Sequence, residues 1–309
     1  MDTALLRALV DVARRGSFAA VARDRDVSAS SVSRKIAALE SELGIRLFQR
    51  TTRRMALTEA GERYLARIAV LLDELDRAGD ESRAARFGPV GTLRLTASVA
   101  FGNACLMPLI PELRASFPKL KLELVLTDAI LDLLTERIDL AIRLGPSPGT
   151  EGIGVKLLDT RYRVCAAPDY IARSSRLNSP ADLANHRCVL FSLPDFRSRW
   201  LFRSMKGALT EVPIDGDVVI SNALAVRHCA IAGVGPALLP NWLIDDDVTE
   251  KRLLDLFPNY RVAATSFDTA AWLLYPSRAF LPQKVRVAID FLKRRLRTKR
   301  RIETDASRS

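Results

Sequence analysis

The stretch that decides the fold is residues 29–58, which read ASSVSRKIAALESELGIRLFQRTTRRMALT. Its first half predicts a helix over residues 29–43, with an apolar stripe formed by Val32, Ile36, Leu39 and Leu43. The opposite face is small or basic and comprises Ser30, Arg34, Ala37, Ala38 and Ser41. Small residues let a helix lie close to the wall of a DNA groove, and an arginine can bind a guanine edge through two hydrogen bonds. An ordinary solvated helix is the alternative, although it would more often carry Glu/Lys pairs on this face.

Two further helices are expected before this one. The first is predicted by apolar residues at helical spacing, Leu6, Leu9, Val10 and Ala13. Gly16 is placed to end it, and Ser17 is placed to cap a short helix over residues 18–24. A turn at residues 26–28 then leads into the third helix. This order predicts a helix-turn-helix whose third helix enters the major groove of DNA.

A basic turn follows the third helix. Residues 45–48 and 55–57 are short alternating segments on either side of residues 49–54, a pattern typical of a β-hairpin. No acidic residue occurs between residues 43 and 58, and arginines on such a tip suit a narrow minor groove or the phosphate backbone. We therefore expect a winged helix-turn-helix that contacts DNA through Ser28, Ser30, Ser33, Arg34, Lys35, Arg50, Thr51, Arg53 and Arg54.

These residues resemble the signature of LysR-type transcriptional regulators. The resemblance is carried by Leu39-Glu40-x-x-Leu43-Gly44-x-x-Leu47-Phe48-x-Arg50 and Leu57-Thr58-x-Ala60-Gly61, with Gly16-Ser17-Phe18 and Val32-Ser33 upstream. It extends to about residue 296. It implies a DNA-binding domain followed by a two-lobed, periplasmic-binding-protein-like (type 2) domain that binds a small-molecule effector. It also implies a homodimer as the smallest unit and a homotetramer as the working form.

Two positions depart from the family pattern. Arg25 stands where the family usually has a buried leucine between the two helices, and Ala29 stands where a glutamine is common. We expect Arg25 either to extend its charged end into solvent or to loosen the packing of the short helix. Ala29 removes one adenine contact, so that base recognition would depend more on Ser30 and Arg34.

Residues 58–86 contain no proline and predict one long helix. Leu65, Ile68, Leu72 and Leu75 recur along it at heptad-like intervals. We expect this seam to pack against the same helix of a second subunit, and packing against the chain's own domain is the alternative. A hinge is expected at residues 87–91.

The rest of the chain alternates strands with helices. Residues 93–97, 120–127 and 138–144 predict strands, and helices are expected around residues 106–113 and 130–135. This order predicts an α/β fold with a parallel sheet. The chain then enters a second α/β unit and returns at the end to the first. We expect five regions: 1–58 for DNA binding, 59–88 as linker helix and hinge, 89–160 plus 266–297 as effector lobe I, 161–265 as lobe II, and 298–309 as a basic, disordered tail.

In sheets of this kind ligands bind beyond the carboxyl ends of the strands. The residues expected there are Ser98, Ala100, Phe101, Thr127, Asp128, Arg143 and Asn222. Ser98 and Phe101 can equally be a helix cap and its apolar neighbour, whereas Thr127 and Asn222 are expected to face each other across the cleft. Arg143 can bind the carboxylate of an anionic effector or form an ion pair with Asp128, and both interpretations remain.

Composition limits the class of protein. The formal net charge is +11, which favours a polyanionic partner such as promoter DNA. No apolar run approaches the length of a membrane span, and the N-terminus lacks the pattern of a signal peptide, so we expect a cytoplasmic protein without a membrane partner. Four separated cysteines are expected to be reduced and mostly buried, with no metal and no cofactor.

The sequence predicts a regulator rather than an enzyme, since it has no GxSxG motif and neither of its two histidines has a second ligand-type residue at metal-binding spacing. The expected function is sequence-specific transcriptional regulation that a small molecule bound between the two lobes modulates. The expected partners are promoter DNA, an anionic effector, further copies of the chain and RNA polymerase. The alternative is a DNA-binding repressor or architectural factor that needs no effector.

Overall fold

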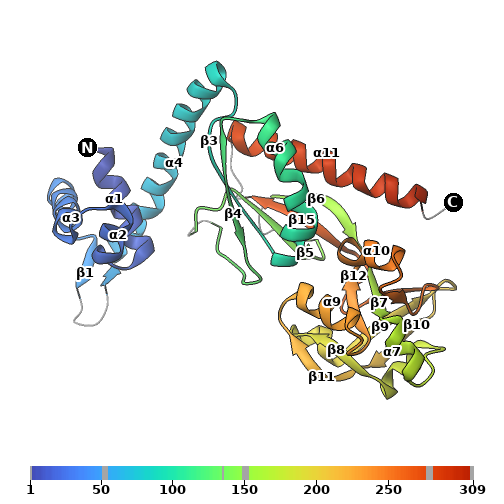
Figure 1. Ribbon diagram of the computed structural model, residues 1–309. Helices are drawn as coiled ribbons and strands as arrows, with labels where there is room; N and C mark the ends of the chain where they lie inside the picture. The colour runs from blue at the N-terminus through green and yellow to red at the C-terminus, as the bar shows by residue number, and fades with distance from the viewer. Residues whose placement is uncertain (1, 51–54, 134–135, 148–152, 276–280, 307–309) are drawn as a thin grey trace. The chain divides into compact units, whose positions relative to one another are not determined.

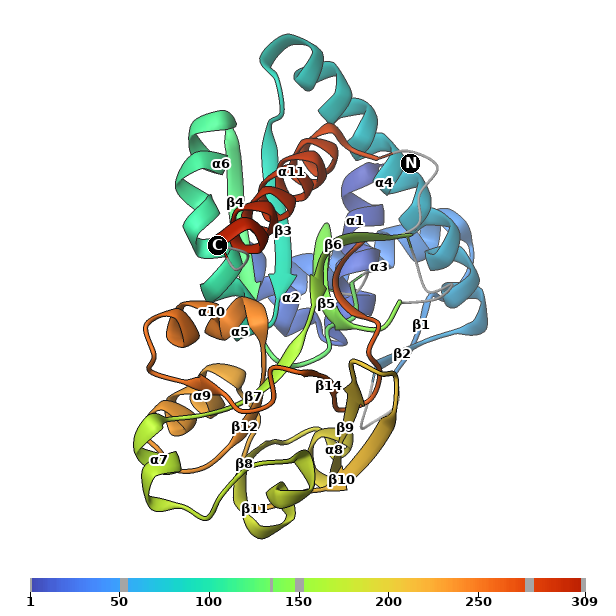
Figure 2. The same cartoon turned by 90° about the vertical axis from the view of Figure 1, so that its right-hand side faces the viewer.

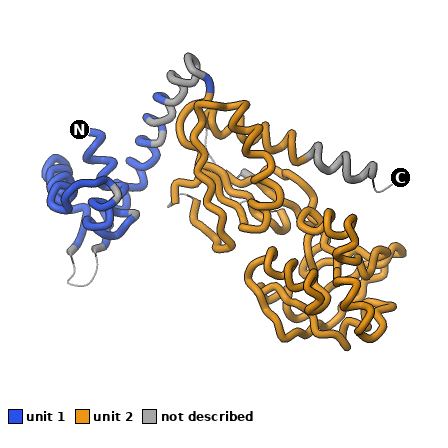
Figure 3. The backbone as a smooth tube through the Cα atoms, viewed as in Figure 1, with its two compact units in different colours: residues 1–88 blue, residues 89–309 orange. Residues whose placement is uncertain are grey.

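The computed structural model describes residues 2–50, 55–133, 136–147, 153–275 and 281–306. By its internal contacts the chain divides into two units, Met1–Gly88 and Pro89–Ser309 (Figure 3). Each unit is described by itself below. Within the described residues, none of the helices combines the length and the apolar character that a membrane crossing needs.

The first unit is a winged helix-turn-helix followed by a long helix (Figure 1). Its elements are α1 (Thr3–Arg15), α2 (Phe18–Arg25), α3 (Ala29–Leu43), β1 (Phe48–Arg50), β2 (Met55–Leu57) and α4 (Glu59–Phe87). The predicted end signals are in place: Gly16 and Gly44 adopt positive φ after α1 and α3, and Ser17 accepts a hydrogen bond from Ala20 N (3.4 Å). Ser28 caps α3 by accepting from Ser31 N at 3.2 Å.

The residues of the family signature hold this unit together. Glu40 Oε1 accepts hydrogen bonds from Leu47 N (2.7 Å) and Phe48 N (3.1 Å), so that one side chain of α3 fixes the start of the wing. A Cβ atom on Gly61 would lie 2.2 Å from the carbonyl oxygen of Leu47, and only glycine lets α4 pass so close to that backbone. The spacing of the signature therefore reflects the packing of α3 and α4 against the start of the wing, in addition to the expected DNA contacts.

The apolar seam predicted on α4 packs mostly against the core of its own unit. Ile68 and Leu72 are buried in the same core as Leu9 and Leu39, and Leu65 packs against that core. Leu75, in contrast, is 51% exposed. Ile68 and Leu72 therefore follow the alternative, packing against the chain's own domain, because the helix-turn-helix is too small to bury its apolar face without α4.

The second unit contains two sheets. Lobe I has the strand order β4-β3-β5-β15-β6, with β4 (Leu120–Leu126), β3 (Gly91–Ala97), β5 (Leu140–Gly145), β15 (Thr269–Tyr275) and β6 (Ile153–Thr160). The helical elements of this lobe are α5 (Val99–Phe101), a π-helical turn η1 (Gly102–Leu106), a 3-10 turn η2 (Met107–Leu109), α6 (Ile110–Ser116) and α11 (Gln283–Ala306). The helix α11 packs on β3 and β6 and buries Val285, Ala288, Phe291 and Leu296 (Figure 1, Figure 2).

Lobe II has the strand order β10-β9-β14-β7-β12-β8-β11, with β13 also paired to β7. These strands are β10 (Leu209–Pro213), β9 (Arg199–Ser204), β14 (Tyr260–Ala263), β7 (Tyr162–Ala166), β12 (Ala237–Pro240), β8 (Arg187–Phe191), β11 (Asp215–Ile220) and β13 (Leu254–Asp255). Its helical elements are α7 (Pro168–Arg173), η3 (Pro180–Asn185), α8 (Pro194–Ser198), α9 (Ala223–Ile231) and α10 (Asn241–Thr249).

Both sheets are mixed, which corrects the expected parallel sheet. In lobe I, β3 runs parallel to β4 and β5, whereas β15 is antiparallel to β5 and β6. The reason is the chain path, since β15 returns from the other lobe and enters its sheet in the opposite direction. Thr269 Oγ1 donates to the carbonyl of Thr160 at 3.0 Å, which ties the outgoing crossing segment to the returning one.

Two local expectations are wrong. The described part of residues 130–135 forms turns rather than a helix, with hydrogen bonds from Glu136 N to Asp132 O (3.1 Å) and from Ile138 N to Leu133 O (2.8 Å). A stretch this short gains little from helix nucleation. The tail at 298–309 was expected to be disordered, but α11 continues to Ala306 because lysine and arginine favour helix and no proline or glycine interrupts them.

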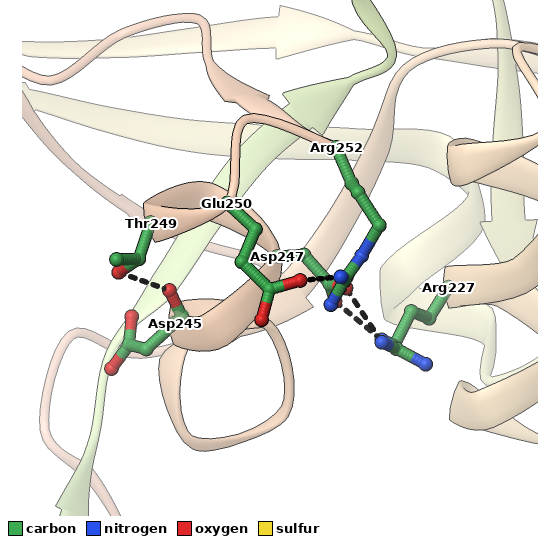
Figure 4. Close-up of polar contacts among 6 residues, drawn as sticks. All are labelled: Arg227, Asp245, Asp247, Thr249, Glu250 and Arg252. Atoms are coloured by element: carbon green, nitrogen blue, oxygen red, sulfur yellow. Dashed lines mark hydrogen bonds and ion pairs between the residues drawn. The ribbon is translucent and has the colours of Figure 1, made fainter.

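Lobe II contains a buried charge network that joins α9 to α10 (Figure 4). The carboxylate of Asp247 is 0% exposed and accepts hydrogen bonds from Arg227 Nη2 (2.6 Å) and Arg252 Nε (2.8 Å). Arg227 Nε contacts its other oxygen. Burial alone would raise the pKa of Asp247, but the two guanidinium groups lower it below its usual value. This network therefore holds a charged carboxylate inside the lobe.

Candidate functional sites

The candidate DNA-binding surface is the exposed face of α3. Ser30, Arg34, Ala37, Ala38 and Ser41 are all exposed, whereas Val32, Ile36 and Leu39 on the opposite stripe are buried. Within the described residues Arg34 has no acidic partner, so its guanidinium group is available to a base edge or a phosphate. Ser33 and Lys35 lie at the edge of this face and are only partly exposed.

Ser28 and Ser30 form a second part of this surface at the start of α3. Their hydroxyl oxygens are 3.0 Å apart, and the Ser28 hydroxyl also caps the helix. Ala29 between them is exposed and carries no hydrogen-bonding group. The N-terminus of α3 therefore presents hydroxyl groups where the family commonly has an amide.

The predicted wing exists as an antiparallel pair of strands, in which Phe48 is opposite Leu57 and Arg50 is opposite Met55. Gln49 Nε2 donates to Leu57 O at 3.3 Å across this pair. Arg50 ends β1, and the other predicted contacts of the tip, Thr51, Arg53 and Arg54, lie outside the described residues.

Arg25 has a structural role that neither sequence-based interpretation anticipated. Its guanidinium group forms an ion pair with Asp11 of α1. The Asp11 side chain is 15% exposed and the Arg25 side chain is 34% exposed. The charge therefore links α2 to α1 where a leucine would link them by apolar contact, and Arg25 does not simply extend into solvent.

The candidate effector site is a cavity of about 750 Å³ between the two lobes. Five of the predicted residues line it: Ser98, Ala100, Thr127, Asp128 and Arg143. Phe101 and Asn222 do not. Phe101 is fully buried, and its ring packs edge-on against Trp242 of α10 with centroids 5.2 Å apart. That contact turns Phe101 into a link between the lobes and leaves Trp242 on the cavity wall.

Asn222 lies behind the cavity and holds Asp128. Asn222 Nδ2 donates to Asp128 Oδ2 at 2.7 Å, and the other oxygen of Asp128 accepts from Val99 N at 3.1 Å. Asn222 Oδ1 meanwhile caps α9 by accepting from Leu224 N (3.0 Å). The hydrogen bond that Asn222 makes to lobe I goes to Asp128, the neighbour of Thr127, while Thr127 Oγ1 accepts from Ala129 N at 3.2 Å.

Arg143 does not pair with Asp128, which decides one of the alternatives left by the sequence. The only hydrogen bond of its guanidinium group within the described residues runs from Nη2 to the carbonyl of Leu131 at 3.3 Å. Burial lowers the pKa of Arg143 from its usual value, since the charged form is partly removed from water. No acidic side chain of the described residues compensates for that cost.

Half of the cavity was missed by the sequence analysis, namely the wall contributed by lobe II. Its apolar members include Tyr162, Phe191, Val226, Leu238, Leu239 and Trp242. Phe191 ends β8 and Ser192 follows it, so both could have been found by the rule applied to lobe I. Tyr162 could not, because it begins β7, and only the antiparallel pairing of that strand brings its start to the cavity.

Comparison with known proteins identifies the family. One family profile, described as "LysR substrate binding domain", matches residues 87–297, and a second, "Bacterial regulatory helix-turn-helix protein, lysR family", matches residues 3–62. The chain belongs to the LysR family. It is a transcriptional regulator with a helix-turn-helix DNA-binding domain and an effector-binding regulatory domain.

The similarity to individual relatives extends over most of the chain. It is 32% identical over 290 residues to the HTH-type transcriptional regulator DmlR of Escherichia coli, covering 93% of this chain and 92% of that protein. It is 30% identical over 287 residues to CrgA of Neisseria meningitidis, covering 93% and 94%. The solved structure of CrgA matches with a TM-score of 0.61 and 29% identity over 96% of this chain and 99% of that one. The full-length structure of the Vibrio cholerae virulence activator AphB shares the fold, with a TM-score of 0.60 and 24% identity over 94% and 98%.

Proposed function

We propose that this LysR-family regulator responds to an anionic small molecule that binds Arg143 in the cavity between the lobes. The observation that supports this proposal is a half-buried guanidinium group on a cavity wall with no acidic partner among the described residues. A guanidinium group stays protonated at neutral pH, and burying it without a counter-charge is unfavourable. An anionic ligand would remove that penalty on binding and would thereby gain affinity.

The other residues of the site follow from the same geometry. We propose that Ser98, Ala100, Thr127 and Asp128 contact the effector with Arg143, since all line the cavity. Phe101 and Asn222 act one step behind it, by supporting Trp242 and Asp128. We assign residues 89–160 with 266–297 to one effector lobe and 161–265 to the other, with the crossings near Thr160 and Thr265.

We further propose that the DNA contacts are Ser28, Ser30, Ser33, Arg34 and Lys35 on α3, with Arg50, Thr51, Arg53 and Arg54 on the wing. The exposed, acid-free face of α3 supports the first group. Arg34 and Ser30 would read base edges, and Ser33 and Lys35 would bind phosphates.

Self-association is proposed from what α4 leaves uncovered. Val70, Leu71 and Leu75 are 62%, 61% and 51% exposed on this helix, after Ile68 and Leu72 have been used in the core. Apolar residues exposed at helical spacing favour a partner helix. We propose a homodimer through this stripe and a homotetramer as the working form, which would present pairs of recognition helices about one DNA turn apart.

The remaining proposals concern the location of the protein in the cell, its macromolecular partners and its lack of enzymatic activity. We propose that the chain acts in the cytoplasm on double-stranded promoter DNA, with RNA polymerase as a further partner, and that it is not an enzyme. The relatives named above are regulators, and the described lining of the cavity contains neither histidine nor cysteine as a nucleophile or base.

The test compares the wild-type protein with Arg143→Met. A panel of small carboxylates, phosphates and sulfonates is screened by thermal unfolding of the full-length protein, since a ligand at 100 times its Kd adds about 2.7 kcal/mol to stability. Arg114→Met, on the exposed surface of α6, is the matched control. We expect an anion that stabilises wild type and the control but not Arg143→Met, and that changes the DNase I footprint on the native promoter. Equal stabilisation of Arg143→Met by every active anion would overturn the proposal.

A further inference from the structure

The charge balance of the cavity limits which anions it can hold. Three charged residues belong to its described lining: Asp128, Arg143 and Asp195. Both carboxylate oxygens of Asp128 are occupied by Val99 N and Asn222 Nδ2, and Asp195 is exposed at the start of α8. Arg143 therefore offers one positive charge in a site whose other two charges are negative. A ligand with a second carboxylate would have no second cation to pair with in the described lining, and an unpaired buried carboxylate is strongly unfavourable.

The rest of the wall is suited to an apolar body. Ile142 of lobe I lines the cavity together with the aromatic and branched side chains of lobe II, among them Phe196 of α8. A cavity of about 750 Å³ that combines this apolar surface with separate hydroxyl groups and one cation suits a small ligand with an apolar body and a few polar groups.

Among the polar groups that lobe II contributes to the lining, the phenol of Tyr162 lies beside the apolar surface. Tyr162 lines the cavity, and its ring packs edge-on against Phe196 with centroids 5.7 Å apart. Among the described residues its hydroxyl group has no hydrogen-bond partner. Burial raises the pKa of Tyr162 to about 12, so that the phenol is neutral and can donate a hydrogen bond at physiological pH. A neutral hydroxyl group on the cavity wall without a protein partner is available to donate a hydrogen bond to a ligand.

We infer that the effector is a monocarboxylate with an aromatic or branched apolar body, whose carboxylate binds Arg143 on lobe I and whose second polar group accepts a hydrogen bond from Tyr162 on lobe II. This inference rests on the proposed function of Arg143. Such a ligand touches β5 and β7 at once, so that its binding energy depends on the distance between the lobes. Tyr162 is then the residue that distinguishes among monocarboxylates of similar size.

The charge requirement is tested with matched probes. Cinnamate, its neutral amide and 4-carboxycinnamate are titrated against the full-length protein, with ligand-observed NMR at millimolar concentration as the readout. We expect cinnamate to bind at least about ten-fold more tightly than the other two, and the advantage over the amide to disappear in Arg143→Met but not in Arg114→Met. Tighter binding of the dicarboxylate in an Arg143-dependent manner would overturn the monocarboxylate class while leaving the proposed function intact. Binding of all probes regardless of Arg143 would overturn both.

The role of Tyr162 is tested with Tyr162→Phe and with cinnamates that carry a methoxy group at position 3 or 4. We expect the variant to lose about three- to ten-fold in affinity for at least one methoxycinnamate while binding unsubstituted cinnamate as before. Tyr260→Phe, in the same sheet but outside the cavity, is the control. An unchanged affinity of Tyr162→Phe for all the methoxycinnamates would overturn this part of the inference. If no cinnamate binds wild type at about 10 mM, a concentration that detects even millimolar Kd values, while another class of anion binds through Arg143, the apolar monocarboxylate is excluded.

Discussion

The two functional regions of this chain each present an arginine without an acidic partner among the described residues, but they present it in opposite environments. Arg34 is exposed on one face of α3. Arg143 is half-buried in a cavity whose walls come from both lobes. An exposed cation interacts weakly with any one partner, because water and salt screen it, and suits a long polyanion with many phosphates. A buried cation interacts strongly with one partner and suits a single small anion.

The same contrast holds for apolar surface. The cavity encloses its apolar side chains within the second unit, whereas the first unit leaves Val70, Leu71 and Leu75 exposed on α4. The second unit therefore contains a complete ligand site in one chain, and the first unit needs another macromolecule, DNA or a second copy, to cover its working surfaces. Four sets of variants test how far this contrast extends, in order of decreasing expected effect.

The largest effect is expected from Asp247→Ala, which leaves Arg227 and Arg252 without their shared carboxylate. Breaking a buried ion pair from one side costs about 3–5 kcal/mol of unfolding free energy. We expect hydrogen exchange to speed up in lobe II and to stay unchanged in α1–α3, since the units have separate cores. Asp246→Ala, the exposed neighbour, is the control. An equal increase in hydrogen-exchange rate in both units would show that they do not fold separately.

The same carboxylate predicts a dependence on pH. Because the folded-state pKa of Asp247 is lowered, its contribution to stability is present above the unfolded pKa and is lost as pH falls through the folded value. Asp247→Asn should flatten the acid limb of the stability curve, as measured by chemical denaturation at a series of pH values.

The next effect is expected from Leu71→Glu combined with Leu75→Glu. Placing two carboxylates in an apolar interface should weaken self-association by about 100-fold or more, which sedimentation velocity at micromolar concentration measures. Ala60→Glu in the first turn of α4 is the control, since it adds charge away from the stripe. A double variant that associates like wild type would mean that α4 does not form the dimer contact.

A smaller effect is expected from Arg34→Ala. If Arg34 reads a base edge, as proposed, its loss should cost about 1–3 kcal/mol on the native operator while binding to unrelated DNA changes little, as measured by fluorescence anisotropy at fixed salt. Arg176→Ala removes the same charge from an exposed position of the second unit and is the control. An equal loss on operator and unrelated DNA would make Arg34 a phosphate contact instead.

The smallest effect is expected from Arg25→Leu, which restores the residue common in the family. The ion pair with Asp11 is partly exposed, and such pairs contribute about 0–1 kcal/mol. We expect the unfolding free energy from chemical denaturation to differ by no more than that, and the difference to shrink at high salt. A loss well above this range would show that Asp11 requires a cation.

The helix-turn-helix could be predicted almost residue by residue, because its signals are local. Gly16, Ser17 and Gly44 mark helix ends through backbone geometry and capping, which neighbouring residues decide. The helix expected at residues 130–135 failed for the opposite reason. The carboxylate of Asp128, just before it, accepts hydrogen bonds from Val99 N and Asn222 Nδ2, both distant in sequence, instead of capping a helix.

The sequence by itself determined the exposed face of α3, the paired strands of the wing, the family and the lobe I edge of the cavity, because each depends on residues close together in the chain. Only the tertiary structure decided that Ile68 and Leu72 belong to the core of their own unit, that Asn222 holds Asp128 and that Arg143 faces the cavity without an acidic partner among the described residues. It also decided that Tyr162 joins the cavity wall. These contacts join segments that are distant in sequence, and their formation depends on which strands pair and in which direction.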